Sequence, residues 1–223
     1  SSVTTQIGAG TTEPPQLLVN YLSPPQSDID QIPKKINYQY YKCDTFVNDM
    51  NVNLAPNASQ SFTNNAIQLS TVPKAIYVYC DIPNSAKSYL TTDTFFRINS
   101  FSLNYLNVSG QFSSMSINDL YNMSVKNGCN MSFQEWSGLT FDYTSNSRYG
   151  LTGSVLKIGI SDLQIPSNVA SGMNMNSQLS YTIGIQNINQ VDTLSVSLTT
   201  VLVYDGLMTI ENGSMTTQIG VID

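Results

Sequence analysis

The chain has 223 residues, of which 41% are hydrophobic and only 11% are charged, with a formal net charge of −6 and no histidine. The lack of histidine excludes Ser-His-Asp and Cys-His nucleophilic centres, and it excludes zinc or iron sites that depend on imidazole. Typical soluble domains carry about 25% charged residues, so this chain has an unusually neutral polar surface that costs less to desolvate.

Such a surface favours a protein that packs against copies of itself, although a neutral extracellular β-domain would have the same composition. The length is ordinary for one all-β domain with a full hydrophobic core. Patterns typical of strands run through the chain. The expected strands cover residues 17–22, 36–46, 66–69, 75–82, 95–108, 154–160, 178–188 and 193–204. Because no helices alternate with these strands, the pattern predicts an all-β sandwich or barrel.

Three of these segments carry a finer signal. Residues 75–82 are apolar on both faces, which predicts a central strand. Within 95–108 the apolar alternation changes phase, and we expect a β-bulge or bend near Ser100. Within 193–204 one face should lie on the core, while the face of Ser197 and Thr199 should meet solvent or a partner.

The connection formed by residues 110–153 is long and contains the only tryptophan, Trp136. Residues 116–126 are the one candidate helix, with Ser116 as N-cap and Asp119 in the first turn. Loops of this length in compact domains are usually functional or interfacial. We therefore expect the connection to be an exposed tower or an inter-subunit contact, with Trp136 as a core or interface anchor.

The three cysteines, Cys43, Cys80 and Cys129, are far apart and form no C-x-x-C pair. Cys43 and Cys80 lie in apolar strand patterns, so buried free thiols are expected, which indicates assembly in a reducing cytoplasm. The nine basic residues are scattered, and only Lys34 and Lys35 are adjacent. Nucleic-acid binding normally needs clustered cations, so no direct nucleic-acid binding is expected.

The sequence offers few carboxylates that could be catalytic. Glu135 beside Trp136 is the one candidate for a paired-carboxylate glycosidase, because Glu13 and Glu211 lie in an arm and in a terminal turn. No partner carboxylate can be nominated for Glu135, so the sequence predicts no catalytic residue and no enzyme.

Two aspartate pairs, Asp28 with Asp30 and Asp44 with Asp49, could offer oxygen ligands to calcium. Neither pair lies in a recognisable calcium-binding loop, so solvated turn carboxylates are the default interpretation, and no metal or cofactor is expected. The sequence also has no signal peptide and no apolar run of membrane length, so no membrane insertion is expected.

Three segments together resemble the C-terminal jelly roll of double-jelly-roll major capsid proteins of large eukaryotic DNA viruses, virophages and Polinton-like viruses. Residues 17–22 and 36–41 resemble the opening strands of that family. Residues 72–79 (VPKAIYVY) resemble its "hP-K-hhhhh" strand, in which h is apolar, and residues 203–213 resemble its closing strand with a Gly-punctuated tail.

This resemblance implies an eight-stranded antiparallel jelly-roll β-sandwich with one long loop containing a short helix. Residues 1–15 would form a linker or N-terminal arm, and residues 16–223 a single jelly-roll domain. The family normally carries two jelly rolls, and this chain has room for one.

The resemblance also implies a structural protein of an icosahedral virus shell that self-assembles into trimeric, pseudo-hexagonal capsomers. Its partners would be copies of itself and other capsid proteins. It would reside in the virion capsid after assembly in the host cytoplasm or a virus factory. The alternative is a carbohydrate-binding jelly-roll lectin or adhesin that stacks sugars on Trp136 or an exposed tyrosine.

Overall fold

The computed structural model describes residues 19–20, 23, 25, 33–87, 96–142, 147–150, 153–166, 168–211 and 213–220. The chain divides into two units, Ser1–Lys34 and Lys35–Asp223, and every described strand lies in the second unit. Of the strand expected at 17–22, only Val19 and Asn20 are described, and neither belongs to a strand; the rest lies outside the described residues.

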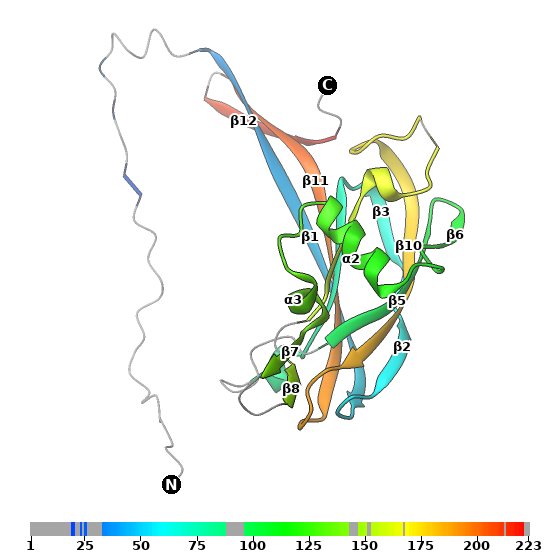
Figure 1. Cartoon of the computed structure of the whole chain (residues 1–223). Helices are drawn as coiled ribbons and strands as arrows, with labels where there is room; N and C mark the ends of the chain where they lie inside the picture. The colour runs from blue at the N-terminus through cyan, green and yellow to red at the C-terminus, as the bar shows by residue number, and fades with distance from the viewer. Residues whose placement is uncertain are drawn as a thin grey trace. The chain divides into compact units, whose positions relative to one another are not determined.

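Two five-stranded antiparallel sheets form the sandwich (Figure 1). The first sheet has the order β1-β11-β4-β9, and β12 also pairs with β11. Its strands are β1 (Lys35–Leu54), β4 (Ala75–Asp81), β9 (Val155–Gly159), β11 (Leu194–Glu211) and β12 (Ser214–Ile219). As expected for residues 75–82, β4 is an interior strand.

The second sheet has the order β2-β10-β5-β6, and β3 also pairs with β10. Its strands are β2 (Ser59–Thr63), β3 (Ile67–Thr71), β5 (Phe96–Tyr105), β6 (Val108–Gln111) and β10 (Asn174–Asn187). A separate two-stranded hairpin joins β7 (Leu139–Asp142) to β8 (Ser147–Gly150). The all-β jelly-roll prediction is confirmed.

The expected count of eight strands is wrong, because the two sheets hold ten. One additional strand is β2. β2 and β3 pair with the same edge of β10, and β5 pairs with its other edge, so β2 and β3 form one strand that is interrupted at residues 64–66. At the interruption the Asn64 side-chain oxygen accepts a hydrogen bond from the Tyr181 backbone N–H at 2.6 Å. Two further strands were not expected: β6, which follows β5 after the turn at residues 106–107, and β12, whose polar sequence carries little strand signal. The segment expected at 17–22 contributes no described strand, so seven expected and three additional strands make the ten.

The predicted phase change in β5 is confirmed. Phe96, Ile98, Phe101 and Leu103 are all buried although their spacing changes from two to three residues. The register shifts between Gly184 and Ile185 of β10, which pair with Ser100 and Ile98, so Asn99 is the extra residue. The bulge therefore keeps both halves of β5 facing the core.

Two predictions of burial are wrong. Cys43 is exposed while Cys80 is buried, because Cys43 lies on the outer face of an edge strand and Cys80 faces the core from an interior strand. Ser197 and Thr199 are buried although they face outward. They are short side chains on the central strand β11, and longer residues of β1 and β4 flank them on both sides.

The predicted helix is confirmed as α2 (Ile117–Lys126). Ser116 and Asp119 form a capping box, in which the Asp119 carboxylate accepts from the Ser116 backbone N–H at 3.0 Å. A shorter helix, α3 (Phe133–Ser137), has the same motif at Ser132 and ends at Gly138, which adopts the left-handed conformation with φ 68°. Two 3₁₀ turns complete the described elements: Asn84–Ala86 and Ile160–Asp162.

Trp136 is an anchor of the core, with its side chain fully buried. Its indole N–H donates to the Val155 carbonyl at 2.9 Å. Ser154 donates to the Trp136 carbonyl at 2.8 Å and accepts from the Ile98 N–H at 3.0 Å, so α3 is tied to both sheets. The ring of Tyr121 packs edge-on against Trp136, with centroids 5.9 Å apart.

We expect Trp136→Ala to reduce the free energy of unfolding by about 3–5 kcal/mol, because it leaves a large cavity and an unsatisfied Val155 carbonyl. Urea unfolding followed by circular dichroism would measure the change. Phe133→Ala is the matched control, since Phe133 is 39% exposed and contacts the same Tyr121 ring. An equal loss in the two variants would contradict the anchoring role of Trp136.

Candidate assembly interface

The two open sides of the sandwich differ in what covers them. On the side of β9 and β5, α2 buries Leu120 and Met123, and α3 buries Trp136. Within the described ranges, no strand pairs with the outer edge of β1 or of β2 and β3 on the other side. The α2–α3 part of the long connection therefore packs on the sandwich rather than projecting as a tower; its contact with another subunit stays a prediction.

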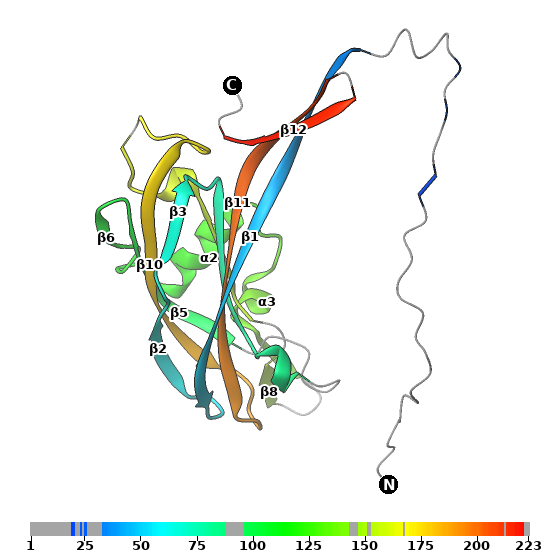
Figure 2. The same ribbon diagram turned by 180° about the vertical axis from the view of Figure 1, so that it is seen from behind.

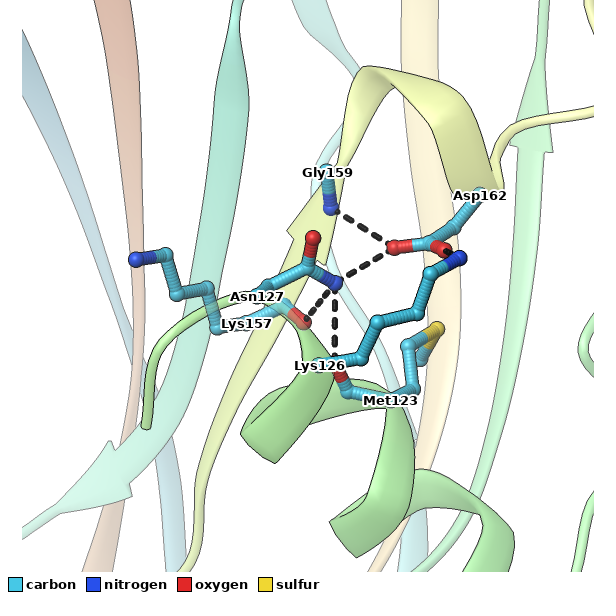
Figure 3. Close-up of polar contacts among 6 residues, drawn as sticks. All are labelled: Met123, Lys126, Asn127, Lys157, Gly159 and Asp162. Carbon is cyan, nitrogen blue, oxygen red and sulfur yellow. Dashed lines mark hydrogen bonds and ion pairs between the residues drawn. The ribbon is translucent and has the colours of Figure 1, made fainter. Parts of the chain in front are cut away.

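A polar network holds the end of α2 against β9 (Figure 3). The Asn127 side-chain N–H₂ donates to the Met123 carbonyl at 2.9 Å, to the Lys157 carbonyl at 3.3 Å and to the Asp162 carboxylate. Asp162 also accepts from the Gly159 N–H at 3.0 Å and pairs with Lys126 at 2.6 Å.

Position 159 requires a glycine because the Asn127 side chain lies too close to its Cα to leave room for a Cβ atom. A Cβ at this position would lie 2.4 Å from the Asn127 side-chain oxygen. The Asp162 side chain is only 7% exposed. Its burial raises the pKa, but hydrogen bonds from Lys126, Asn127 and Gly159 outweigh that effect and hold the pKa of Asp162 below its usual value.

We expect Asp162→Asn to lower the free energy of unfolding by about 2 kcal/mol at neutral pH, because charge-assisted hydrogen bonds are lost. A lowered folded-state pKa stabilises the fold above the unfolded pKa of about 3.9, and this contribution disappears as the pH falls through the folded value. Unfolding curves between neutral and acid pH would therefore converge for wild type and variant. A constant difference across that range would contradict the role of the charge.

Exposed apolar side chains concentrate on β1. Of the described residues with large exposed hydrophobic side chains, four lie within ten positions of this strand: Tyr38 at 48%, Tyr41 at 65%, Phe46 at 39% and Val47 at 63% exposure. Tyr41 and Val47 lie on the outer face of the sheet and Tyr38 and Phe46 on its inner face, so these residues are distributed over both faces of the strand. Single exposed hydrophobic residues are ordinary, but four on one edge strand make β1 a candidate interaction surface. Sequence reasoning identified the strand and missed this surface, since the pattern does not reveal that β1 is an edge.

Two lysines near β1 are held by contacts within the chain. Lys74 Nζ lies 2.8 Å from Asp205 and 4.7 Å from the centre of the Tyr41 ring. The hydrogen bond to Asp205 raises the pKa of Lys74 against the opposing effect of burial. Lys157 lies over the Tyr77 ring at 5.1 Å. On the outer face of the first sheet, these two lysines thus lie over the aromatic rings of Tyr41 and Tyr77.

Glu135, the one suggestive carboxylate, has a structural role. It accepts a hydrogen bond from the Ser132 backbone N–H at 2.7 Å as part of the α3 capping box. This bond lowers the pKa of Glu135, whereas a catalytic acid needs a raised value. Glu211 pairs with Lys35 at 3.9 Å. Glu13 lies outside the described residues.

Of the calcium candidates, Asp44 and Asp49 are not brought together, because they lie on opposite faces of β1. Asp44 pairs with Lys42 at 3.0 Å, and the described residues contain no group of three or more His, Cys, Asp or Glu that could hold a metal ion. Asp28 and Asp30 lie outside the described residues. Among the described helices, none has the length and hydropathy needed to cross a membrane.

Comparisons with known proteins agree with this geometry. Residues 41–206 match the family described as "Major capsid protein V20 C-terminal domain". The capsid protein V20 of Sputnik virophage is 31% identical over 202 residues, which cover 85% of this chain and 34% of that protein. This chain thus spans about a third of the length of that relative.

Two solved structures are similar. A chain in the cryo-EM structure of the Sputnik virophage has 31% identity and a TM-score of 0.78, over 86% of this chain and 40% of that one. The mavirus major capsid protein has a TM-score of 0.74 over 91% of this chain and 44% of that one. At 19% identity, the mavirus likeness shows the fold alone.

The fold and these similarities define a jelly-roll protein of the viral major capsid class. More particularly, the chain belongs to the family of the C-terminal domain of the V20 major capsid protein.

Proposed function

We propose that this jelly roll is a structural wall element of an icosahedral virion capsid and acts by packing against copies of itself and other capsid proteins. Membership of the V20 family carries this proposal. The low charge content and the exposed hydrophobic residues of β1 support it, because both reduce the cost of burying large areas.

The proposed assembly unit is a homotrimer with a pseudo-hexagonal outline, in which each subunit contributes two jelly rolls. Upright packing of jelly rolls would use their long sides, and the open side at β1 is the one that helices leave uncovered. Obligate interfaces typically bury about 2,000–5,000 Å². We further propose that residues 1–15 form an arm or linker to a second jelly roll, and residues 16–223 one domain.

The proposed role is non-catalytic and does not include direct nucleic-acid binding. Five lysines are engaged by carboxylates: Lys35, Lys42, Lys74, Lys87 and Lys126. Such cations are poorly available to phosphates. Assembly would take place in the host cytoplasm or a virus factory. A lectin role has less support, since Trp136, the best stacking platform, is fully buried.

We expect the intact protein to form trimers and then closed particles, and the trimers to persist between about 0.1 and 1 M salt, because neutral interfaces are little screened. Native mass spectrometry and negative-stain imaging would detect both species. A glycan array on the same preparation tests the lectin alternative. A monomer that binds a glycan and is missing from purified virus particles would contradict the capsid role.

A further inference from the structure

The first sheet continues past its other strands as a three-stranded ribbon. β4 pairs with β11 only from Ser197 to Val203, and β12 then pairs with β11 from Gly206 to Glu211. We call residues 35–41 of β1, residues 205–211 of β11 and β12 the terminal ribbon. Figure 2 shows that it projects beyond the neighbouring strands of both sheets.

The two faces of the terminal ribbon have opposite character. Residues paired across antiparallel strands share a face, so the register assigns each side chain. One face carries three rows: Tyr40, Gly206 and Ile219; then Tyr38, Met208 and Thr217; then Ile36, Ile210 and Met215. This apolar face contains no charged residue.

The opposite face of the terminal ribbon is polar and largely satisfied within itself. Lys35 pairs with Glu211 at 3.9 Å. The Thr209 hydroxyl donates to the Asn37 side-chain oxygen at 2.9 Å. This alternation of apolar and polar residues is typical of a sheet with one buried face.

Beyond its first row, the apolar face is only partly covered by the described residues of Lys35–Asp223: Ile36, Met208 and Ile210 are half-buried, and Tyr38, Met215 and Thr217 are exposed. Ile219 packs against the hydrophobic core, and Tyr204 is the last buried core residue of β11. Tyr38 is 48% exposed and Met215 is 65% exposed. The apolar face thus extends the inner face of the first sheet past the point where the second sheet covers it.

We propose that the apolar face of the terminal ribbon packs against the same face of a second copy of this chain, as a two-fold contact within the shell. This inference rests on the capsid role proposed above. An uncharged face of aliphatic, methionine and tyrosine side chains matches an equally uncharged surface, and each copy offers one. Two identical faces also satisfy each other without an unpaired charge.

The size of the face determines when this contact forms. Three strands, each about seven residues long and spaced about 4.8 Å apart, cover about 350 Å² per copy, or about 700 Å² for the pair. Stable free dimers bury about 1,200–2,000 Å². The contact is therefore too small to hold two free subunits together, and it forms in assembled particles, where other contacts position the ribbons.

The test is cysteine cross-linking in particles assembled from the intact protein. Met208 is at the centre of the apolar face, and its neighbour Leu207 is on the polar face with similar intermediate exposure. Met208→Cys and Leu207→Cys are compared in a Cys43→Ser, Cys129→Ser background, with a bis-maleimide that spans the spacing of about 10 Å between packed sheets. Buried Cys80 stays in place.

We expect Met208→Cys particles to give a homodimer band several-fold stronger than Leu207→Cys particles, and dilute unassembled protein to give neither. Mass spectrometry identifies the linked peptides. Particles in which Met208→Cys links no second copy, or links a different protein, overturn the ribbon contact and leave the capsid role intact. If the protein enters no particle at all, the capsid role fails first.

A charge placed on the apolar face gives a second readout. Met215→Lys should lower particle yield several-fold without changing urea unfolding of the free protein, because Met215 is largely exposed there. Thr216→Lys, exposed on the polar face of the same strand, should assemble like the wild type. Equal yields of the two variants would overturn the contact.

Discussion

The pairing of β1 with β11 is the constraint on which the rest of the molecule depends. It runs from Lys35 opposite Glu211 to Leu54 opposite Leu194, with one irregularity between Asp49 and Asn53. Because side chains alternate between faces, a slip of one residue would turn the core residues of β11 outward. The same ladder therefore sets the core, the outer face of the first sheet and the terminal ribbon.

In the part of the chain that the structure describes, α2 and α3 cover one side of the sandwich and leave the side of β1 open. The α2 and α3 helices, fixed by Asn127, Asp162 and Trp136, cover the side at β9 without using β1. The uncovered strand carries the exposed aromatic and aliphatic residues. The contacts that stabilise the domain are thus separate from the exposed residues of β1 on which the proposed assembly role draws.

Local signals in the sequence were sufficient where local physics decides the structure. The phase change around Ser100 predicted the bulge at Asn99, and the spacing of Ser116 and Asp119 predicted the start of α2. Exposure on a long strand is different, since it depends on which strand becomes its neighbour. Cys43 was expected to be buried for this reason, and the amphipathic character of β12 emerges only from its register with β11.

The interruption between β2 and β3 has a consequence for the solubility of the free chain. The Asn64 side chain replaces a regular backbone partner at Tyr181, so this edge of the second sheet is divided into two short segments. Unbroken edges recruit strands of unrelated chains, and short, irregular ones resist fibrillar aggregation. The division of this edge thereby lowers the tendency of other chains to add a strand beside β2 and β3.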